Sequence, residues 1–592
     1  MKKWVEMFTH FLKNKIYVIV LALTAACSYG FMITNYAIGI DDTPYAYYFE
    51  EGLSAIVGRW VMFLLNKVVN IAEFAPFLTD LVGVLIFMVA VTAWCVLFYS
   101  ILGDRVPGYG YLFFACIFLS CPLISEVYVY YLHNGIAIGY LCSGISLYLF
   151  SEAVDSWFVK KNGKGGEKYA AEGCVTERLA LGKRLILLAG VAVFLWIALG
   201  CYESFMMVWL MGVCLILMLK RICGKRDNVF AVIGIAGVVA VGGIILRSIT
   251  ISLVTAIFDL EYLKDDAVQR SITELVGWIF EEGAFSNFAM ALKRTYVMYG
   301  VFACAYYPIF VFVLATIVIM IVALWMSIRK KDVWIFLLTI EAYVAAFSLI
   351  VIEGKVTFYR AAQFLPVICG LGALLFVYAV QGIVGVGISC LQKKLGKNGK
   401  SLKTEMVKIE KMAIVIKSVA IFLLSSVLWN QCADMNKWFY IDYMKYEAAK
   451  ETMNAVALEL EKGFDTTKPI VFTGIYEIPE SIIQDAYVGY GTKEYSWMVR
   501  TTTWLDAHLL EKFYRDQGVI VAQMPSLSVI EWGRTAFDTD EELVKFFNMH
   551  GYSYLPLLDV EYEEAEKWAA GLASFPQEGS IKDAGEYIIV NF

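Results

Sequence analysis

Charged residues are scarce in this chain of 592 residues: they make up 18% of it, whereas hydrophobic residues make up 59%. A soluble globular domain carries more charge than this, so the composition excludes one as the main part of the chain. The sequence contains repeated apolar runs close to the roughly 20 residues that a helix needs to cross about 30 Å of hydrocarbon. It therefore predicts a polytopic α-helical membrane protein.

Motifs for metal or phosphate chemistry are also missing. The thirteen cysteines show no C-x-x-C or histidine-paired spacing, and the hydrophilic tail after Cys432 has none, so no disulfide framework is expected there. That tail also lacks a glycine-rich phosphate loop and a G-x-S-x-G elbow. His508 and His550 lie far apart in it, and we interpret each as a surface or core histidine.

Eleven apolar runs are predicted to span the membrane, and the first is interpreted as an uncleaved span rather than a signal peptide. Their approximate positions are 16–36, 76–102, 110–130, 134–153, 184–201, 204–220, 229–250, 301–328, 333–352, 361–385 and 412–430. Lysine and arginine collect in the loops 159–184, 220–226, 329–331 and 392–403. With a cytoplasmic N-terminus, eleven alternating spans put all of these loops in the cytoplasm, in agreement with the positive-inside rule.

Two domains follow from this topology. Residues 1–430 are expected to form the transmembrane domain, and residues 431–592 a small extracytoplasmic α/β domain. Short β-rich runs, such as 468–474, 518–523 and 585–592, alternate with helical stretches in the tail. This alternation is typical of an α/β fold.

The external loop after the first span carries a helical pattern. Thr43 followed by Pro44 is a helix-start signal, and a second helical stretch follows Gly52. Its apolar residues recur at steps of three and four, with polar residues opposite. The apolar face contains Leu53, Ile56, Val57, Trp60, Leu64, Leu65 and Val68, and the polar face Arg59, Asn66 and Asn70. We predict an amphipathic segment at 44–72 that lies along the outer membrane surface.

Two adjacent carboxylates, Asp41 and Asp42, stand where the first span should leave the membrane. They have a structural interpretation, because a carboxylate near a helix N-terminus interacts favourably with its positive end. They also have a functional interpretation, because a helix start alone does not account for two acids beside an aromatic tract. The pair by itself does not decide between the two.

Ionisable side chains gather at the outer ends of several other spans. Each alone could extend to the interface, but charges at this depth usually face the bundle interior or a wet cavity. The sequence therefore predicts a cavity on the outer side. The residues are Glu126, His133, Glu203, Lys355 and Arg360, with Arg247 somewhat deeper.

Glycosyl transfer suits such a cavity. A carboxylate can take the proton from an attacking hydroxyl, and Arg or Lys can hold the phosphate of a leaving group. An aromatic rim can stack on sugar rings. These groups together favour transfer from a lipid-phosphate-linked sugar to an external acceptor.

Three patches then resemble a known family. GIDDTPYAYYFEEGLSAIVGRW (39–60), GCYESF (200–205) and FYRAAQFLP (358–366) are similar to the Glucosyl transferase II (Gtr-type) family, of the GT-C class of polytopic glycosyltransferases. The resemblance implies a GT-C-like membrane glucosyltransferase that uses polyprenyl-phosphate glucose to decorate a cell-surface glycan. It implies no cofactor and no tightly bound metal, although a divalent cation is possible. The expected partners are membrane lipid, donor and glycan, not nucleic acid.

The same resemblance makes Asp41 or Asp42 the catalytic base, or the residue that positions it. Depth and charge add further candidates. Those for the donor phosphate are Arg59, Arg247, Lys355 and Arg360, and those for the sugar or acceptor are Glu126, His133, Asn134, Tyr202 and Glu203.

Two alternatives compete with this enzyme. One is a transporter or flippase of a lipid-linked saccharide, which Glu341, inside a predicted span, would favour. The chain lacks the repeated halves usual in transporters, and its polar groups gather at the outer surface. The other alternative is a membrane anchor that presents the tail as a binding module, but this would need only one or two spans.

Overall fold

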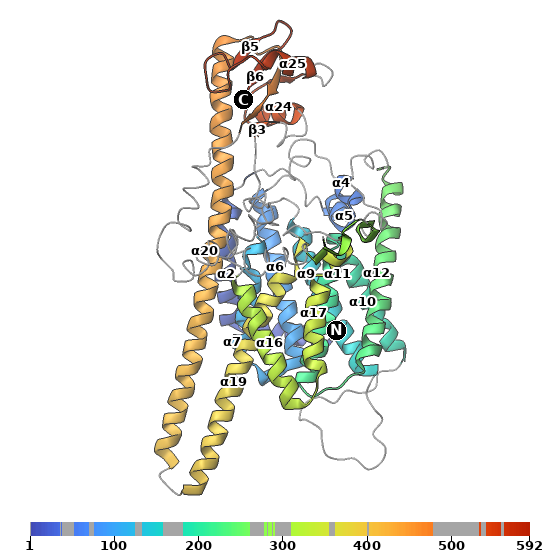
Figure 1. Cartoon of the computed structure of the whole chain (residues 1–592), viewed down its shortest axis with the longest axis vertical. Helices are drawn as coiled ribbons and strands as arrows, with labels where there is room; N and C mark the ends of the chain where they lie inside the picture. The colour runs from blue at the N-terminus through green and yellow to red at the C-terminus, as the bar shows by residue number, and fades with distance from the viewer. Residues whose placement is uncertain are drawn as a thin grey trace.

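The computed structural model describes most of the chain. The described residues are 2–35, 37, 52–69, 76–124, 133–157, 181–260, 277–280, 282–286, 288–289, 310–353, 361–398, 402–476, 532–533, 540–557 and 562–592. Long apolar helices form a bundle, and a small sheet domain lies beyond one end of it (Figure 1).

The helices occupy the predicted apolar runs. Among the described residues, nine helices are long and apolar enough to cross a membrane, and two shorter apolar helices, Gly108–Ile124 and Trp334–Ala346, lie where two further spans were predicted. The prediction of a polytopic helical membrane protein is therefore confirmed. The main helices are α1 (Lys2–Lys13), α2 (Lys15–Thr34), α6 (Pro76–Leu102), α7 (Gly108–Leu119), α9 (His133–Trp157), α10 (Leu181–Cys201), α11 (Phe205–Ile222), α12 (Val229–Ile257), α16 (Phe310–Lys330), α17 (Trp334–Ala346), α18 (Ser348–Glu353), α19 (Phe364–Asn398) and α20 (Leu402–Gly463).

Helix α20 joins the two parts of the molecule. The predicted last span and the predicted first helix of the tail are one continuous helix of 62 residues. The sequence between them, QCADMNKWFYID, has no glycine or proline to end a helix. From Tyr446 onward its side chains pack in the core of the sheet domain, so this one helix extends from the bundle into that core.

The sheet of the C-terminal domain has helices on both faces. Its strand order is β4 (Leu555–Pro556), β1 (Pro469–Thr473), β6 (Ile588–Asn591), β5 (Ile581–Asp583); β1 is parallel to β4 and β6, and β5 is antiparallel to β6. Successive side chains of a strand point to opposite faces. Ile470 and Phe472 therefore pack with α20 and α24 (Asp540–Met549), whereas Val471 packs with α25 (Tyr562–Ala569).

We name the two ends of the bundle by what lies beyond them. The domain face is the end toward the C-terminal domain, where α4 (Gly52–Ile56), α5 (Trp60–Val69) and the 202–204 turn lie (Figure 1). The hairpin face is the opposite end, toward which the connected ends of α19 and α20 project, and it contains the 223–228 and 331–333 turns (Figure 1).

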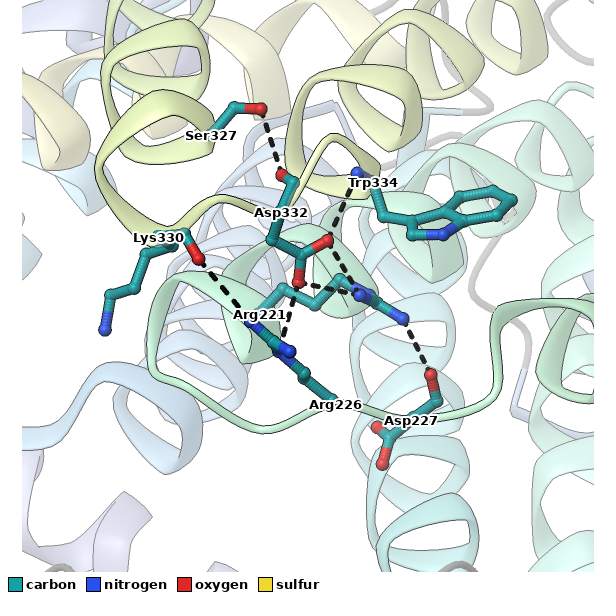
Figure 2. Close-up of polar contacts among 7 residues, drawn as sticks. All are labelled: Arg221, Arg226, Asp227, Ser327, Lys330, Asp332 and Trp334. Atoms are coloured by element: carbon teal, nitrogen blue, oxygen red, sulfur yellow. Dashed lines mark hydrogen bonds and ion pairs between the residues drawn. The ribbon is translucent and has the colours of Figure 1, made fainter.

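A polar network ties two turns of the hairpin face together (Figure 2). The buried guanidinium of Arg221 donates from one nitrogen to both carboxylate oxygens of Asp332, at 2.8 and 3.0 Å, and from another to the backbone oxygen of Asp227 at 2.8 Å. Nε of Arg226 lies 3.6 Å from the same Asp332 carboxylate, which also accepts from the backbone N–H of Trp334 at 3.2 Å. Part of the basic charge predicted for these loops is thus neutralised inside the protein.

Removing the acid of this network should destabilise the fold. Asp332→Ala leaves the guanidinium of Arg221 buried without its carboxylate, and breaking a buried pair in this way costs about 3–5 kcal/mol. We expect a loss of that size in the free energy of unfolding, measured in detergent micelles with denaturant. Lys330→Ala is the control, because that side chain is exposed, and its effect should stay within about 0.5 kcal/mol. Equal stability of the two variants would contradict the structural role of Asp332.

Candidate functional site

The predicted site residues fall into three groups. Arg59, Tyr202, Glu203 and Arg247 are described with their side chains. His133 and Asn134 are the first two residues of α9, and their backbone is described. The others lie outside the described residues: Asp41, Asp42, Glu126, Lys355 and Arg360.

Two short helices replace the continuous helix predicted after Gly52. Helix α4 ends at a left-handed residue, Gly58, whose φ is 90°. The N–H of Gly58 bonds to the carbonyl of Ala55 at 3.0 Å, and the N–H of Arg59 to that of Ser54 at 2.7 Å. This pair of bonds is the Schellman arrangement that ends a helix, and glycine adopts its conformation without steric cost. The turn fixes the backbone of Arg59 directly before α5.

Helix α5 packs on the ends of α10 and α12. The indole of Trp60 stacks on that of Trp196 with ring centroids 4.5 Å apart, and Nε1 of Trp196 donates to the Thr250 hydroxyl at 3.0 Å. Gly200 leaves the space for the Trp60 ring, since a Cβ at that position would collide with it. Aromatic packing therefore holds the α4–α5 segment on the bundle.

The described side chains of the segment agree with its predicted faces in part. Trp60 of the predicted apolar face is buried, whereas Val57 and Val68 of the same face are 37% and 80% exposed, as apolar side chains that contact lipid would be. Asn66, predicted on the polar face, is 2% exposed, so that prediction is wrong. Its position depends on the protein neighbours of the helix, because Trp60 and Phe63 pack against α10 and α12.

Arg247 and Glu203 form an ion pair on the domain face. Nη2 of Arg247 lies 3.3 Å from Oε2 of Glu203, and its Nε donates to the backbone oxygen of Leu199 at 3.0 Å. The guanidinium also lies directly against Gly58, where a Cβ would collide with it. The residues predicted to bind donor and acceptor separately are thus paired with each other, and Arg247 supports the turn that carries Arg59.

Arg59, Tyr202, Glu203 and Arg247 form a polar cluster on the domain face. Arg59 is the cation of this cluster that is available for a ligand. Its guanidinium carbon lies 4.9 Å from the ring centroid of Tyr202. Within the described part of the chain, that cation–π contact is its side-chain interaction, and no carboxylate pairs with it. A guanidinium presents a planar set of donors that matches a phosphate. Arg59 and Tyr202, which come from separate elements, therefore form a place where an anion can bind beside an aromatic surface.

Two further polar residues lie on the segments that carry Arg59 and Glu203. Asn66 on α5 and Ser204, directly before α11, are buried, and their side-chain polar atoms have no hydrogen-bond partner among the described residues. The sequence analysis did not predict either as a site residue. A single asparagine among apolar residues was the available signal at Asn66.

The fold and this cluster define a polytopic membrane protein with a polar site at one end of its helical bundle. Residues 30–377, more than half of the chain, match the family model described as Glucosyl transferase GtrII, and the chain belongs to this family. It is therefore a membrane glycosyltransferase. The matched residues contain all of the predicted site residues, and the predicted family is confirmed.

One solved structure is similar to the chain. It is the crystal structure of ArnT from Cupriavidus metallidurans bound to undecaprenyl phosphate, at 11% sequence identity and a TM-score of 0.29, and the match covers 84% of this chain and 90% of that chain. At this TM-score the likeness adds nothing to the assignment, which rests on the family match. The comparison with curated proteins gives no match.

The Gly58 turn can be tested directly. Gly58→Ala introduces a Cβ that collides with the Arg247 guanidinium, at a backbone φ that costs a non-glycine residue about 1–3 kcal/mol. We expect a loss of that size in the free energy of unfolding, together with reduced glycosyl transfer. Gly237→Ala on α12 is the control, because a Cβ there meets no atom within 4 Å. A Gly58→Ala protein as stable and active as this control would contradict the described turn.

Proposed function

We propose that this glycosyltransferase moves glucose, or a similar hexose, from a polyprenyl-phosphate-linked donor to a cell-surface glycan on the extracytoplasmic side of the cell membrane. The observation that carries the proposal is the Arg59 guanidinium, which lies over the Tyr202 ring without a carboxylate partner among the described residues. The donor's phosphate would supply the negative charge that no described residue provides to Arg59.

The surroundings of Arg59 suit a donor that remains in the membrane. Helix α12, against which the Gly58 turn packs, exposes a long apolar side that includes Val241, Ile245 and Ile249. Such a surface favours contact with lipid chains. A polyprenyl chain lying along it would bring its phosphate to the end of the helix, near Arg59.

The proposed reaction uses one base and one phosphate site. Asp41 or Asp42 accepts the proton of the acceptor hydroxyl, whose oxygen attacks the anomeric carbon of the donor. The bond between that carbon and the phosphate oxygen breaks, and polyprenyl phosphate leaves with Arg59 stabilising its charge. The role of the aspartates rests on the family resemblance. Lys355 and Arg360 remain candidates for the phosphate, and Glu126, His133, Asn134 and Glu203 for the sugar or acceptor.

The side of the membrane is proposed from the distribution of charge. Exposed cations lie on the hairpin face, opposite the candidate site: Arg226 is in the 223–228 turn, and Arg329 and Lys330 end helix α16 directly before the 331–333 turn. By the positive-inside rule that face is cytoplasmic, which leaves the candidate site and the C-terminal domain outside.

A lipid-linked saccharide transporter is the second candidate function. Glu341 lies in α17, surrounded in sequence by apolar residues, and intramembrane carboxylates often mark a transport pathway. Membership of a glucosyltransferase family favours the enzyme over this alternative.

The acid pair provides the first test of the proposal. Asp41→Asn and Asp42→Asn, made separately, should leave the protein folded, and one of them should lower transfer from polyprenyl-phosphate glucose about 10²–10⁴-fold, the usual contribution of a general base. Transfer is measured in vesicles that contain the purified protein. Undiminished transfer in both variants would remove the assignment, and lipid movement without transfer in the wild type would support the transporter.

Arg59 provides the second test. Arg59→Ala should raise the KM for the donor about 10–100-fold, because a hydrogen bond to a charged group contributes about 1.5–3 kcal/mol. Arg59→Lys should restore only part of the affinity, since lysine lacks the planar fork. The control is Arg329→Ala on the hairpin face, which should leave the KM unchanged. An unaltered KM in both Arg59 variants would show that the phosphate binds elsewhere.

A further inference from the structure

Asn66 on α5 has an unusual environment. Its side chain is 2% exposed, and neither the oxygen nor the nitrogen of its carboxamide has a hydrogen-bond partner among the described residues. A buried polar group without a partner costs about 1–3 kcal/mol, and an apolar side chain of similar shape would avoid this cost. Buried polar groups in native proteins are nearly always paired. Asn66, whose two polar side-chain atoms both lack a partner among the described residues, is therefore a candidate for binding a partner from outside them.

The contacts of Met62 indicate which helix lies beside the side of α5 that carries Asn66. Residues four apart on a helix lie on the same side, so Asn66 shares its side of α5 with Met62. The thioether of Met62 packs on Gly135 in the first turn of α9: a Cβ on Gly135 would lie 2.9 Å from the Met62 sulfur and 3.8 Å from the backbone oxygen of Cys201. The side of α5 that carries Asn66 therefore faces the N-terminal end of α9.

That end of α9 presents backbone N–H groups that the helix itself leaves without a partner. The first N–H groups of a helix have no partner within it, and α9 is a helix of 25 residues. Ser204 supports the same location: Phe205, which follows it, packs on Gly139 one turn further along α9. The contacts to the first two turns of α9 are thus made by Met62, one helical turn before Asn66, and by Phe205, directly after Ser204.

We propose that Asn66, together with the N-terminal turn of α9, binds hydroxyl groups of the donor hexose. This inference rests on the proposed function. A carboxamide both donates and accepts hydrogen bonds, as two neighbouring sugar hydroxyls require. A phosphate would satisfy its nitrogen but not its oxygen, so a sugar fits this site better. Arg59 and Asn66 are separated by about 10 Å along the chain direction of α5, a distance that a hexose and its phosphate can span.

The test compares the binding of two lipids to wild-type protein and to Asn66→Leu in detergent micelles. The lipids are polyprenyl-phosphate glucose and polyprenyl phosphate. We expect Asn66→Leu to bind the glucose lipid at least about 10-fold more weakly, while the affinity for polyprenyl phosphate stays within about 2-fold. The free energy of unfolding should be unchanged or higher, because an unpaired group is removed. Glucose lipids that lack a single hydroxyl provide a further check. Removal of a hydroxyl that contacts Asn66 should weaken binding to the wild type but should not weaken binding to Asn66→Leu further.

Gln381→Leu on α19 is the matched control, because its carboxamide oxygen is also buried without a partner among the described residues. It should leave both affinities unchanged. Two results would overturn the role of Asn66. In the first, Asn66→Leu loses affinity for both lipids to the same extent. In the second, Asn66→Leu and Gln381→Leu bind the glucose lipid with equal affinity. A wild type that binds the glucose lipid no more tightly than polyprenyl phosphate would also overturn it. A wild type that discriminates between the lipids but transfers no sugar would count against the proposed function alone.

Discussion

The contact between Arg247 and the Gly58 turn determines the geometry of the candidate site. The guanidinium fills the space beside a glycine that has no Cβ, and it is held there by the Leu199 carbonyl and the Glu203 carboxylate. Trp60 adds the apolar part of the same attachment through its stacking on Trp196. Because Arg59 lies between Gly58 and Trp60 in the chain, these two contacts decide where its guanidinium can reach.

The attachment also explains why a charged residue is tolerated in the half of α12 toward the domain face. Arg247 is bonded and paired, so its charge is not left alone against lipid. Its interactions are structural, whereas those of Arg59 leave the guanidinium able to meet an external anion. Two arginines that have the same candidate role in the sequence thus differ in the structure. The hairpin face shows the same contrast between a structural and an exposed cation: Arg221 is buried and hydrogen-bonded to Asp332, whereas Lys330 is exposed.

The sequence was sufficient to predict the positions of the helices, because an apolar run of membrane-spanning length is a strong local signal. It also predicted strands at 468–474 and 585–592, where β1 and β6 lie. Pairings between distant residues could not be predicted: Glu203 and Arg247 are 44 positions apart, and Arg221 and Asp332 are 111 apart. The burial of Asn66 was missed for a related reason, because helical periodicity does not identify the neighbour that a face will meet. Asp41 and Asp42, which carry most of the family resemblance, lie outside the described residues.

An experimental structure of the protein with polyprenyl phosphate bound tests the central claim most directly. The account predicts a phosphate on the domain face, within about 3 Å of the Arg59 guanidinium nitrogens, the usual length of a charge-assisted hydrogen bond. It also predicts that Arg247 keeps its contacts with Glu203 and Gly58 in that complex. A phosphate bound at Arg247 after the ion pair with Glu203 has opened, or one bound among the cations of the hairpin face, would contradict the account.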